Sequence, residues 1–148
     1  MRIPAALTLL MALALAACES VIPERNSSFA HIPTDGWAYG DTVSLQMPPA
    51  GGRATSLALR HTDSYPYRNL WIEISQRHAD GKNALRDTIN IEMCDAYGQW
   101  HGSGFGDSYQ ISVRLPEIPD TTELRIRHIM RTDTLREITQ IGIISSDK

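Results

Sequence analysis

The fold is decided by the stretch from Leu85 to Asp107, which reads LRDTINIEMC and then DAYGQWHGSGFGD. In its first half apolar and polar residues alternate, a period of two that is typical of a β-strand with one buried face. The two sets are Ile89, Ile91 and Met93 against Thr88, Asn90 and Glu92. The second half, which we call the glycine stretch (Asp95–Asp107), breaks this pattern with four glycines and three aromatic residues.

Short segments with the same alternation lie on both sides of this stretch, and several end at proline or glycine pairs such as Pro48-Pro49 and Gly51-Gly52. Asp80-Gly81 predicts a hairpin turn between two of them. No convincing helical period follows Cys18, although one helical turn near Thr132–Arg136 stays open. The apolar rows are Val43, Leu45 and Met47; Leu57 and Leu59; Leu70, Ile72 and Ile74; Tyr109, Ile111, Val113 and Leu115; Leu124, Ile126, His128 and Met130; and Ile138–Ile144.

This organisation predicts an all-β fold, a single antiparallel β-sandwich or jelly-roll-like domain over residues 33–148. A domain of about 115 residues is large enough for two packed sheets with one core between them.

The first residues have a different composition. Arg2 is followed by an almost entirely apolar run from Ile3 to Ala17, which is too short to span a bilayer as a helix and is typical of an export signal. It ends in Leu15-Ala16-Ala17-Cys18, the pattern of a bacterial lipobox. We therefore expect a lipoprotein signal peptide over residues 1–17 and lipid on Cys18. A flexible polar tether is expected over residues 18–32. The alternative is an ordinary signal with an incidental cysteine.

Charge limits the partners of the mature chain. The full sequence has 14 basic and 17 acidic residues and a net charge of −3; removing residues 1–17 takes away one basic residue, which leaves 13 and 17 and a charge of −4. A mildly acidic chain without a basic stripe argues against a nucleic-acid partner and against electrostatic adhesion to anionic lipid. Membrane attachment is instead expected from the acyl chains on Cys18, at about 0.8 kcal/mol for each buried methylene.

Few residues suggest a reaction or a metal site. Cys94 ends an apolar row and is expected to be a buried structural cysteine. The histidines lack the pair spacing of a zinc site, and His128 lies on an apolar row like a core residue. Asp95 and Asp107 could hold calcium together, but turn capping is the commoner role of aspartate. No nucleophile, base and orienting residue follow from the spacing, so we expect no enzyme, no cofactor and no metal.

The glycine stretch has two interpretations. It is not a phosphate loop, because a strand and not a helix follows it. In the first interpretation the glycines let a long connection cross between the sheets, and Trp100 and Phe105 plug the end of the sandwich. In the second it is a binding loop in which Tyr97, Trp100, Phe105 and Asp107 contact a sugar or peptide.

Trp71 raises a related question. It alternates with Leu70 and Ile72, so it is either exposed or lies under a second cover. Exposed tryptophans in line on a β-sandwich, drawn from Trp37, Trp71 and Trp100, would suggest carbohydrate binding.

Several motifs occur in order along the chain. They are the lipobox; Pro33 to Trp37; Asp41-Thr42-Val43-Ser44-Leu45; Tyr67-Arg68-Asn69-Leu70-Trp71; Asp87-Thr88; Trp100-His101-Gly102-Ser103-Gly104-Phe105-Gly106-Asp107; His128-Ile129-Met130-Arg131; and Ile141-Gly142-Ile143. Together they resemble the GldH family, the gliding-motility-associated lipoproteins of the Bacteroidetes, and the resemblance covers essentially the whole mature chain.

The resemblance implies export, lipid anchoring and a part in a cell-surface motility apparatus. It does not imply an enzymatic activity and gives no catalytic residues to carry over. Relatives also occur in bacteria that do not glide, so the cellular process stays open for this chain. A run of acidic residues after Cys18, expected of a surface-export tag in these bacteria, is missing. The expected location is therefore the outer membrane, facing the periplasm.

Two functions stay open. The first is a non-enzymatic accessory or scaffold subunit of an envelope machine, with envelope proteins as partners. The second is a lipoprotein that binds a glycan or peptide through the glycine stretch.

Overall fold

A computed structural model describes residues 26–47, 54–116 and 121–146 of the chain. These residues form antiparallel strands, and no helix occurs among them. Accordingly, this part of the protein holds no helix of the length and apolarity that a membrane span requires. The predicted signal peptide, Cys18 and the first part of the predicted tether lie outside the described residues.

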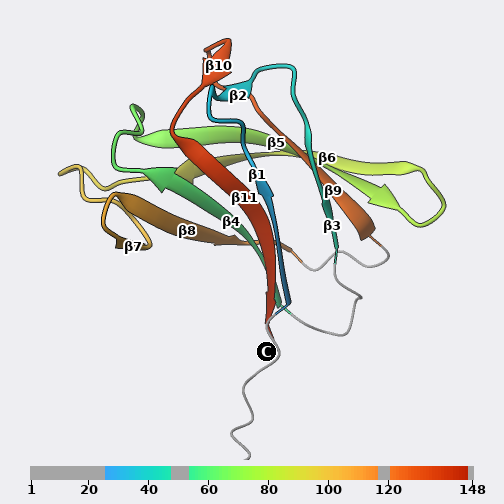
Figure 1. Ribbon diagram of the computed structural model, residues 1–148. Coiled ribbons are helices and arrows are strands. Elements are labelled where there is room, and N and C mark those ends of the chain that lie inside the picture. Colours follow the sequence, from blue (N-terminus) through green and yellow to red (C-terminus); the bar gives the residue numbers. More distant parts are fainter. Residues whose placement is uncertain (1–25, 48–53, 117–120, 147–148) are drawn as a thin grey trace, which may run out of the picture.

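Two sheets form the body of the domain (Figure 1). The five-stranded sheet has the order β1-β11-β4-β8-β7. Its strands are β1 (Asn26–His31), β11 (Ile138–Ser146), β4 (Ala54–Thr62), β8 (Ser108–Arg114) and β7 (Ser103–Phe105). The four-stranded sheet has the order β3-β9-β5-β6. Its strands are β3 (Val43–Gln46), β9 (Thr121–His128), β5 (Asn69–His78) and β6 (Asn83–Glu92).

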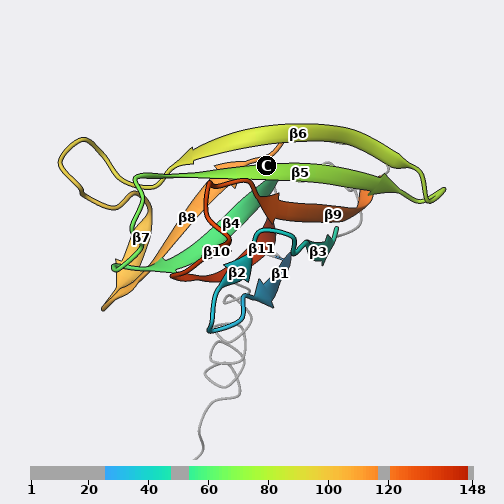
Figure 2. The same cartoon turned by 90° about the horizontal axis from the view of Figure 1, so that it is seen from above.

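The view from above shows the two sheets stacked on each other (Figure 2). Edge strands β1 and β3 contact each other on one side of the sandwich. A small third sheet pairs β2 (Trp37–Ala38) with β10 (Thr134–Leu135). The all-β antiparallel sandwich predicted from the sequence is therefore confirmed.

The apolar rows of the sequence meet in the space between the sheets. Leu57, Leu59 and Ile141 come from the five-stranded sheet and Leu70 and Ile72 from the four-stranded one, and all five are at most 1% exposed. They belong to one continuous core cluster. Burying each such side chain contributes about 1.5–3 kcal/mol, so the alternating rows account for the stacking of the sheets.

Of the two local turns predicted near strand ends, one is formed and one is not. The Asp80-Gly81 hairpin is confirmed, because it joins the antiparallel pair β5 and β6 and Gly81 has a φ of +79°. The helical turn left open near Thr132–Arg136 is not formed, because Thr134 and Leu135 pair with β2 instead.

The predicted start of the domain at Pro33 is wrong. The first strand begins at Asn26 and pairs with β11 from Asn26↔Ser145 to His31↔Gln140. This strand was missed because it is an edge strand with mostly exposed polar residues and carries no apolar alternation. Its Phe29 lies against Gly142, where an added Cβ would sit 2.4 Å from the ring, and Arg60 stacks on that ring at 4.3 Å.

The register places the start of β1 and the glycine stretch at opposite ends of the five-stranded sheet. Asn26 is aligned through β11 with Thr55, near the beginning of β4. Thr62, at the other end of β4, is aligned with Ser108 and through it with Phe105. Seven residue steps of strand separate Thr55 from Thr62, a distance of about 23 Å.

Two histidines are buried in the core with 0% exposure. His128 Nε2 lies 2.9 Å from the Trp37 carbonyl oxygen, and His61 Nδ1 lies 2.8 Å from the Thr62 carbonyl oxygen. Within the described residues, the other ring nitrogen of each has no hydrogen-bond partner. Burial lowers the pKa of both rings, and the hydrogen bonds to backbone carbonyls raise it. The effect of burial is the larger, so both pKa values lie below 6.5. The predicted core position of His128 is confirmed.

These histidines predict an acid-dependent loss of stability. Each buried ring favours folding only in its neutral form. Its contribution to the free energy of unfolding is therefore complete above the unfolded-state pKa of 6.5. It is lost as the pH falls below that value towards the lower folded-state pKa. The free energy of unfolding should fall by up to about 1.4 kcal/mol per pH unit for each histidine. Urea denaturation between pH 7.5 and pH 5 measures the slope. His61→Phe should halve it, and an unchanged slope in that variant would contradict this account.

Candidate contact surface at the glycine stretch

The glycine stretch carries the chain from the four-stranded sheet to the five-stranded one, as the first interpretation predicted. Met93, just after β6, fixes the start of the crossing with two backbone hydrogen bonds. Its N–H donates to the Arg68 carbonyl at 2.8 Å, and its carbonyl accepts the N–H of His101 at 2.9 Å. Cys94 then forms an isolated antiparallel bridge with Trp100. The crossing is therefore a hydrogen-bonded part of the domain.

Asp95 closes the turn within this crossing. Its carboxylate Oδ1 accepts the backbone N–H groups of Tyr97 at 2.8 Å and Gln99 at 2.9 Å. These hydrogen bonds lower the pKa of Asp95, and the one from Gln99 has the largest effect. Arg68 Nη2 donates to the Asp95 carbonyl at 3.0 Å. Asp95 therefore has the turn-capping role that the sequence favoured over calcium binding.

Trp100 points back into the domain, where it joins rings from other segments. Its centroid lies 4.8 Å from that of His61, 6.2 Å from Tyr109 and 6.4 Å from Tyr65. His61 also stacks on Tyr109 at 5.7 Å with 18° between the ring planes. Trp100 is only partly exposed, so its ring helps close this end of the sandwich.

Tyr97 and Phe105 lie on the outside. Their side chains are 92% and 94% exposed, so the prediction that Phe105 plugs the end of the sandwich is wrong. Phe105 ends the three-residue edge strand β7 and is followed by Gly106 with a φ of +65°, which makes the tight turn into β8. This hairpin tip projects its last side chain to solvent. Two large rings thus stand free at one end of the molecule.

Asp107 holds that tip to a neighbouring segment through its backbone. The Asp107 carbonyl accepts the N–H of Asp63 at 2.8 Å. Its side chain is exposed. Of the four residues predicted for a binding loop, Tyr97, Phe105 and Asp107 lie at the surface, and Trp100 faces the aromatic cluster.

The sequence did not point to His61 and Tyr65 as members of that cluster. His61 continues the row of Leu57 and Leu59 on β4, and that row was the available signal. Tyr65 is 4% exposed although it lies in a polar turn, and its hydroxyl donates to the Asn69 carbonyl at 3.0 Å. Nothing in the local pattern of the turn indicated its burial.

The three tryptophans do not form an exposed line. Trp37 is 1% exposed, and its indole N–H donates to the Asp41 carbonyl at 3.0 Å. Trp71 is 41% exposed on the outer face of β5, and Trp100 lies in the cluster just described. Only the Trp71 ring is free to stack on a ligand.

No group of three or more histidine, cysteine, aspartate or glutamate side chains within the described residues is arranged to hold a metal ion. Cys94 is a free, buried thiol at 4% exposure, as predicted. The glycine stretch therefore presents two exposed rings, Tyr97 and Phe105, on a backbone fixed by the hydrogen bonds of Met93 and Asp95, which we call the frame.

The frame makes a prediction about two glycines. Gly102 and Gly98 have similar left-handed φ values of +86° and +83°. At Gly102 an added Cβ would lie 2.1 Å from the Gln110 carbonyl oxygen, whereas at Gly98 it would meet nothing within 4 Å. Gly98→Ala should therefore lower the free energy of unfolding by about 1–2 kcal/mol, the cost of the backbone strain alone.

Gly102→Ala adds a backbone clash to the same strain and should cost at least about 4 kcal/mol, a value typical of severe steric disruption. Urea denaturation of the two variants beside the parent protein measures the difference. Equal losses for both would show that Gly102 does not lie against β8 as described.

Comparison with known proteins identifies the family to which the domain belongs. A search of curated proteins found no match to the chain. The sequence model of the GldH lipoprotein family matches residues 25–144, which includes every strand described here except the last two residues of β11. The chain therefore belongs to the GldH lipoprotein family, a family of membrane-anchored lipoproteins.

Proposed function

We propose that this protein is a non-enzymatic accessory or scaffold subunit of a cell-envelope machine of the gliding-motility type. Lipid on Cys18 holds it in the outer membrane, facing the periplasm, and the glycine stretch contacts a protein partner. The exposure of Tyr97 and Phe105 on a hydrogen-bonded frame is the observation that carries this proposal.

The chemistry of the two rings supports contact with a protein. Aromatic residues are enriched at protein interfaces, and burial of one such side chain contributes about 1.5–3 kcal/mol. The frame adds to this effect because Asp95 and Met93 already fix the backbone. A partner therefore binds a surface that loses little conformational entropy.

The position of the rings relative to the anchor supports the same function. Cys18 precedes Asn26 by eight positions, which limits their separation to about 29 Å. Asn26 is at one end of the five-stranded sheet and Phe105 is at the other. In Figure 1, β7 and the start of β1 lie well apart. Phe105 thus lies at the opposite end of the sheet from Asn26, the strand residue nearest in sequence to Cys18.

The contact can be tested in the host envelope with a photoreactive phenylalanine analogue at position 105 or 97. Both positions should give the same crosslinked product, containing one envelope protein identifiable by mass spectrometry. The matched control is position 82, because the Lys82 side chain is 84% exposed at the tip of the β5–β6 hairpin. Equal crosslinking from position 82, or no product from positions 97 and 105, would contradict the proposed contact.

Anchoring is tested separately with the two cysteines. Cys18→Ala should abolish labelling by radioactive palmitate and move the protein out of the membrane fraction, because no acyl chain can then be attached. Cys94→Ala is the control, since Cys94 is a buried thiol inside the domain. Palmitate labelling that is lost in Cys94→Ala and kept in Cys18→Ala would overturn the assignment.

A further inference from the structure

The outer face of β5 carries a row of side chains that the proposed contact does not use. Leu70, Ile72 and Ile74 face the core, and Asn69, Trp71, Glu73 and Ser75 alternate with them on the outside. Alternate residues of a strand lie about 6.6 Å apart, so this outer row is about 20 Å long. Trp71, 41% exposed, stands within it.

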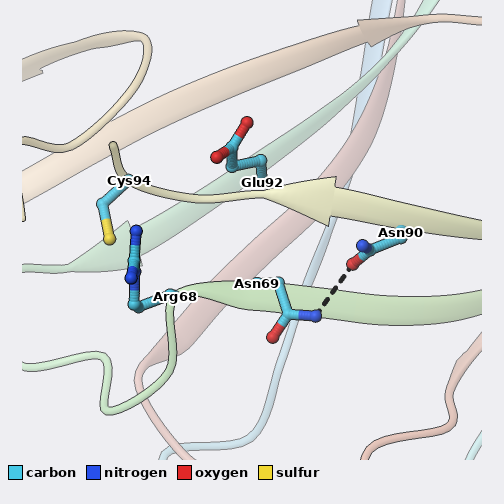
Figure 3. Close-up of a pocket in the computed structure, with 5 residues that line it drawn as sticks. All are labelled: Arg68, Asn69, Asn90, Glu92 and Cys94. Carbon is cyan, nitrogen blue, oxygen red and sulfur yellow. Dashed lines mark hydrogen bonds between the residues drawn. The ribbon is translucent and has the colours of Figure 1, made fainter. Parts of the chain in front are cut away.

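A hollow of about 550 Å³, which we call the amide hollow, lies beside Asn69 and Asn90, where β5 begins and β6 ends (Figure 3). It is lined by Arg68, Asn69, Asn90, Glu92 and Cys94. The Asn69 side-chain amide donates to the Asn90 amide oxygen at 2.9 Å, which orients both groups. Asn90 is also the β6 partner of Trp71. Trp71 therefore follows Asn69 in the outer row, and Asn69 lines this hollow of amide, guanidinium, carboxylate and thiol groups.

A second hollow of about 150 Å³, the arginine hollow, includes Glu73, which follows Trp71 in the outer row. Its lining residues are Thr42, Glu73, Ser75, Arg86, Arg125 and Arg127. Arg127 donates twice to the Glu73 carboxylate, at 2.8 and 3.2 Å, and Arg86 Nε lies 3.6 Å from the same group. The hydrogen bonds from Arg127 lower the pKa of Glu73, so this carboxylate stays ionised at neutral pH.

The charge of the arginine hollow favours an anion. Three arginines and one glutamate give it a formal charge of +2, in a chain whose net charge is −3. Guanidinium groups bind carboxylate and phosphate with paired hydrogen bonds. Glu73 holds Arg127 in place. The side chains of Arg127 and Arg86 are 36% and 71% exposed, so this ordered cluster of guanidinium groups is accessible to an anion.

The topology argues against an extended peptide on this face. β5 lies between β6 and β9 and pairs with both, so its backbone is used within the sheet. A peptide that adds a strand needs a free sheet edge. A ligand across Trp71 must therefore be held by side chains alone, through ring stacking, hydrogen bonds to amides and pairing with guanidinium groups. A polyhydroxylated ligand with anionic groups meets these requirements.

We propose that the outer face of β5 binds an acidic polysaccharide. Trp71 stacks on one sugar ring, the amide hollow bonds hydroxyl groups of a neighbouring sugar, and the arginine hollow receives a carboxylate. The amide hollow shares Arg68 and Cys94 with the frame of the glycine stretch, but neither Tyr97 nor Phe105 lines either hollow, so either proposal can fail without the other.

Affinity electrophoresis of the full mature lipoprotein in detergent tests the site, with polygalacturonate as the acidic saccharide. Dextran is the neutral saccharide, and poly-L-glutamate is the acidic polymer without sugar rings. Polygalacturonate should retard the protein, whereas dextran and poly-L-glutamate should do so at least tenfold more weakly. Trp71→Ala and Arg125→Gln should each weaken polygalacturonate binding about tenfold. Arg125 is chosen because the Arg127–Glu73–Arg86 network then stays intact.

Phe105→Ala is the matched control, because it removes an exposed ring from β7 in the other sheet and should bind polygalacturonate as the parent does. Thermal melting checks that Trp71→Ala is folded, which its exposure predicts. Failure of polygalacturonate to bind would overturn the proposal. Binding of poly-L-glutamate as strong as that of polygalacturonate would also overturn it. The same holds if the parent and folded Trp71→Ala bind polygalacturonate with equal affinity, since either result means that charge alone is recognised.

Discussion

The structure depends on how the chain crosses from one sheet to the other between Met93 and Gly102. The two sheets are held together by apolar burial, which has no direction, whereas the crossing fixes how their ends meet. Backbone hydrogen bonds at Met93, the Cys94–Trp100 bridge and the Asp95 cap give it a defined shape. Trp100 is directed inward against His61, whereas Tyr97 in the turn and Phe105 at the tip of the β7–β8 hairpin are exposed.

The domain thus offers two surfaces of different chemistry. The glycine stretch presents exposed rings on a fixed backbone, a combination suited to a protein partner. The outer face of β5 presents one tryptophan among amides and arginines, a combination suited to the acidic polysaccharide proposed for it. Taken together, the two proposals describe a lipoprotein that joins an envelope protein to an acidic glycan.

The sequence predicted the sandwich because alternation is the direct consequence of burying one face of each strand, as in Leu70–Ile74. It failed at β1, because an edge strand with exposed residues such as Asn26 carries no such signal. It also misplaced Phe105, since hydrophobicity alone does not show that a residue sits at a hairpin tip. The arginine hollow combines residues from β5, β6 and β9 with Thr42, and only the strand register brings them together.

The claim on which the rest depends is that the glycine stretch is a fixed part of the domain. Amide hydrogen exchange measured by NMR tests it directly at three donors whose bonds define the crossing: His101 to Met93, Asp95 to Gln99, and Gln99 to the Asp95 carboxylate. We predict that these amides exchange at least a hundredfold more slowly than unstructured amides, about 2.7 kcal/mol of protection. Exchange at the rate of an unstructured chain, with the strands on both sides protected, would contradict the account.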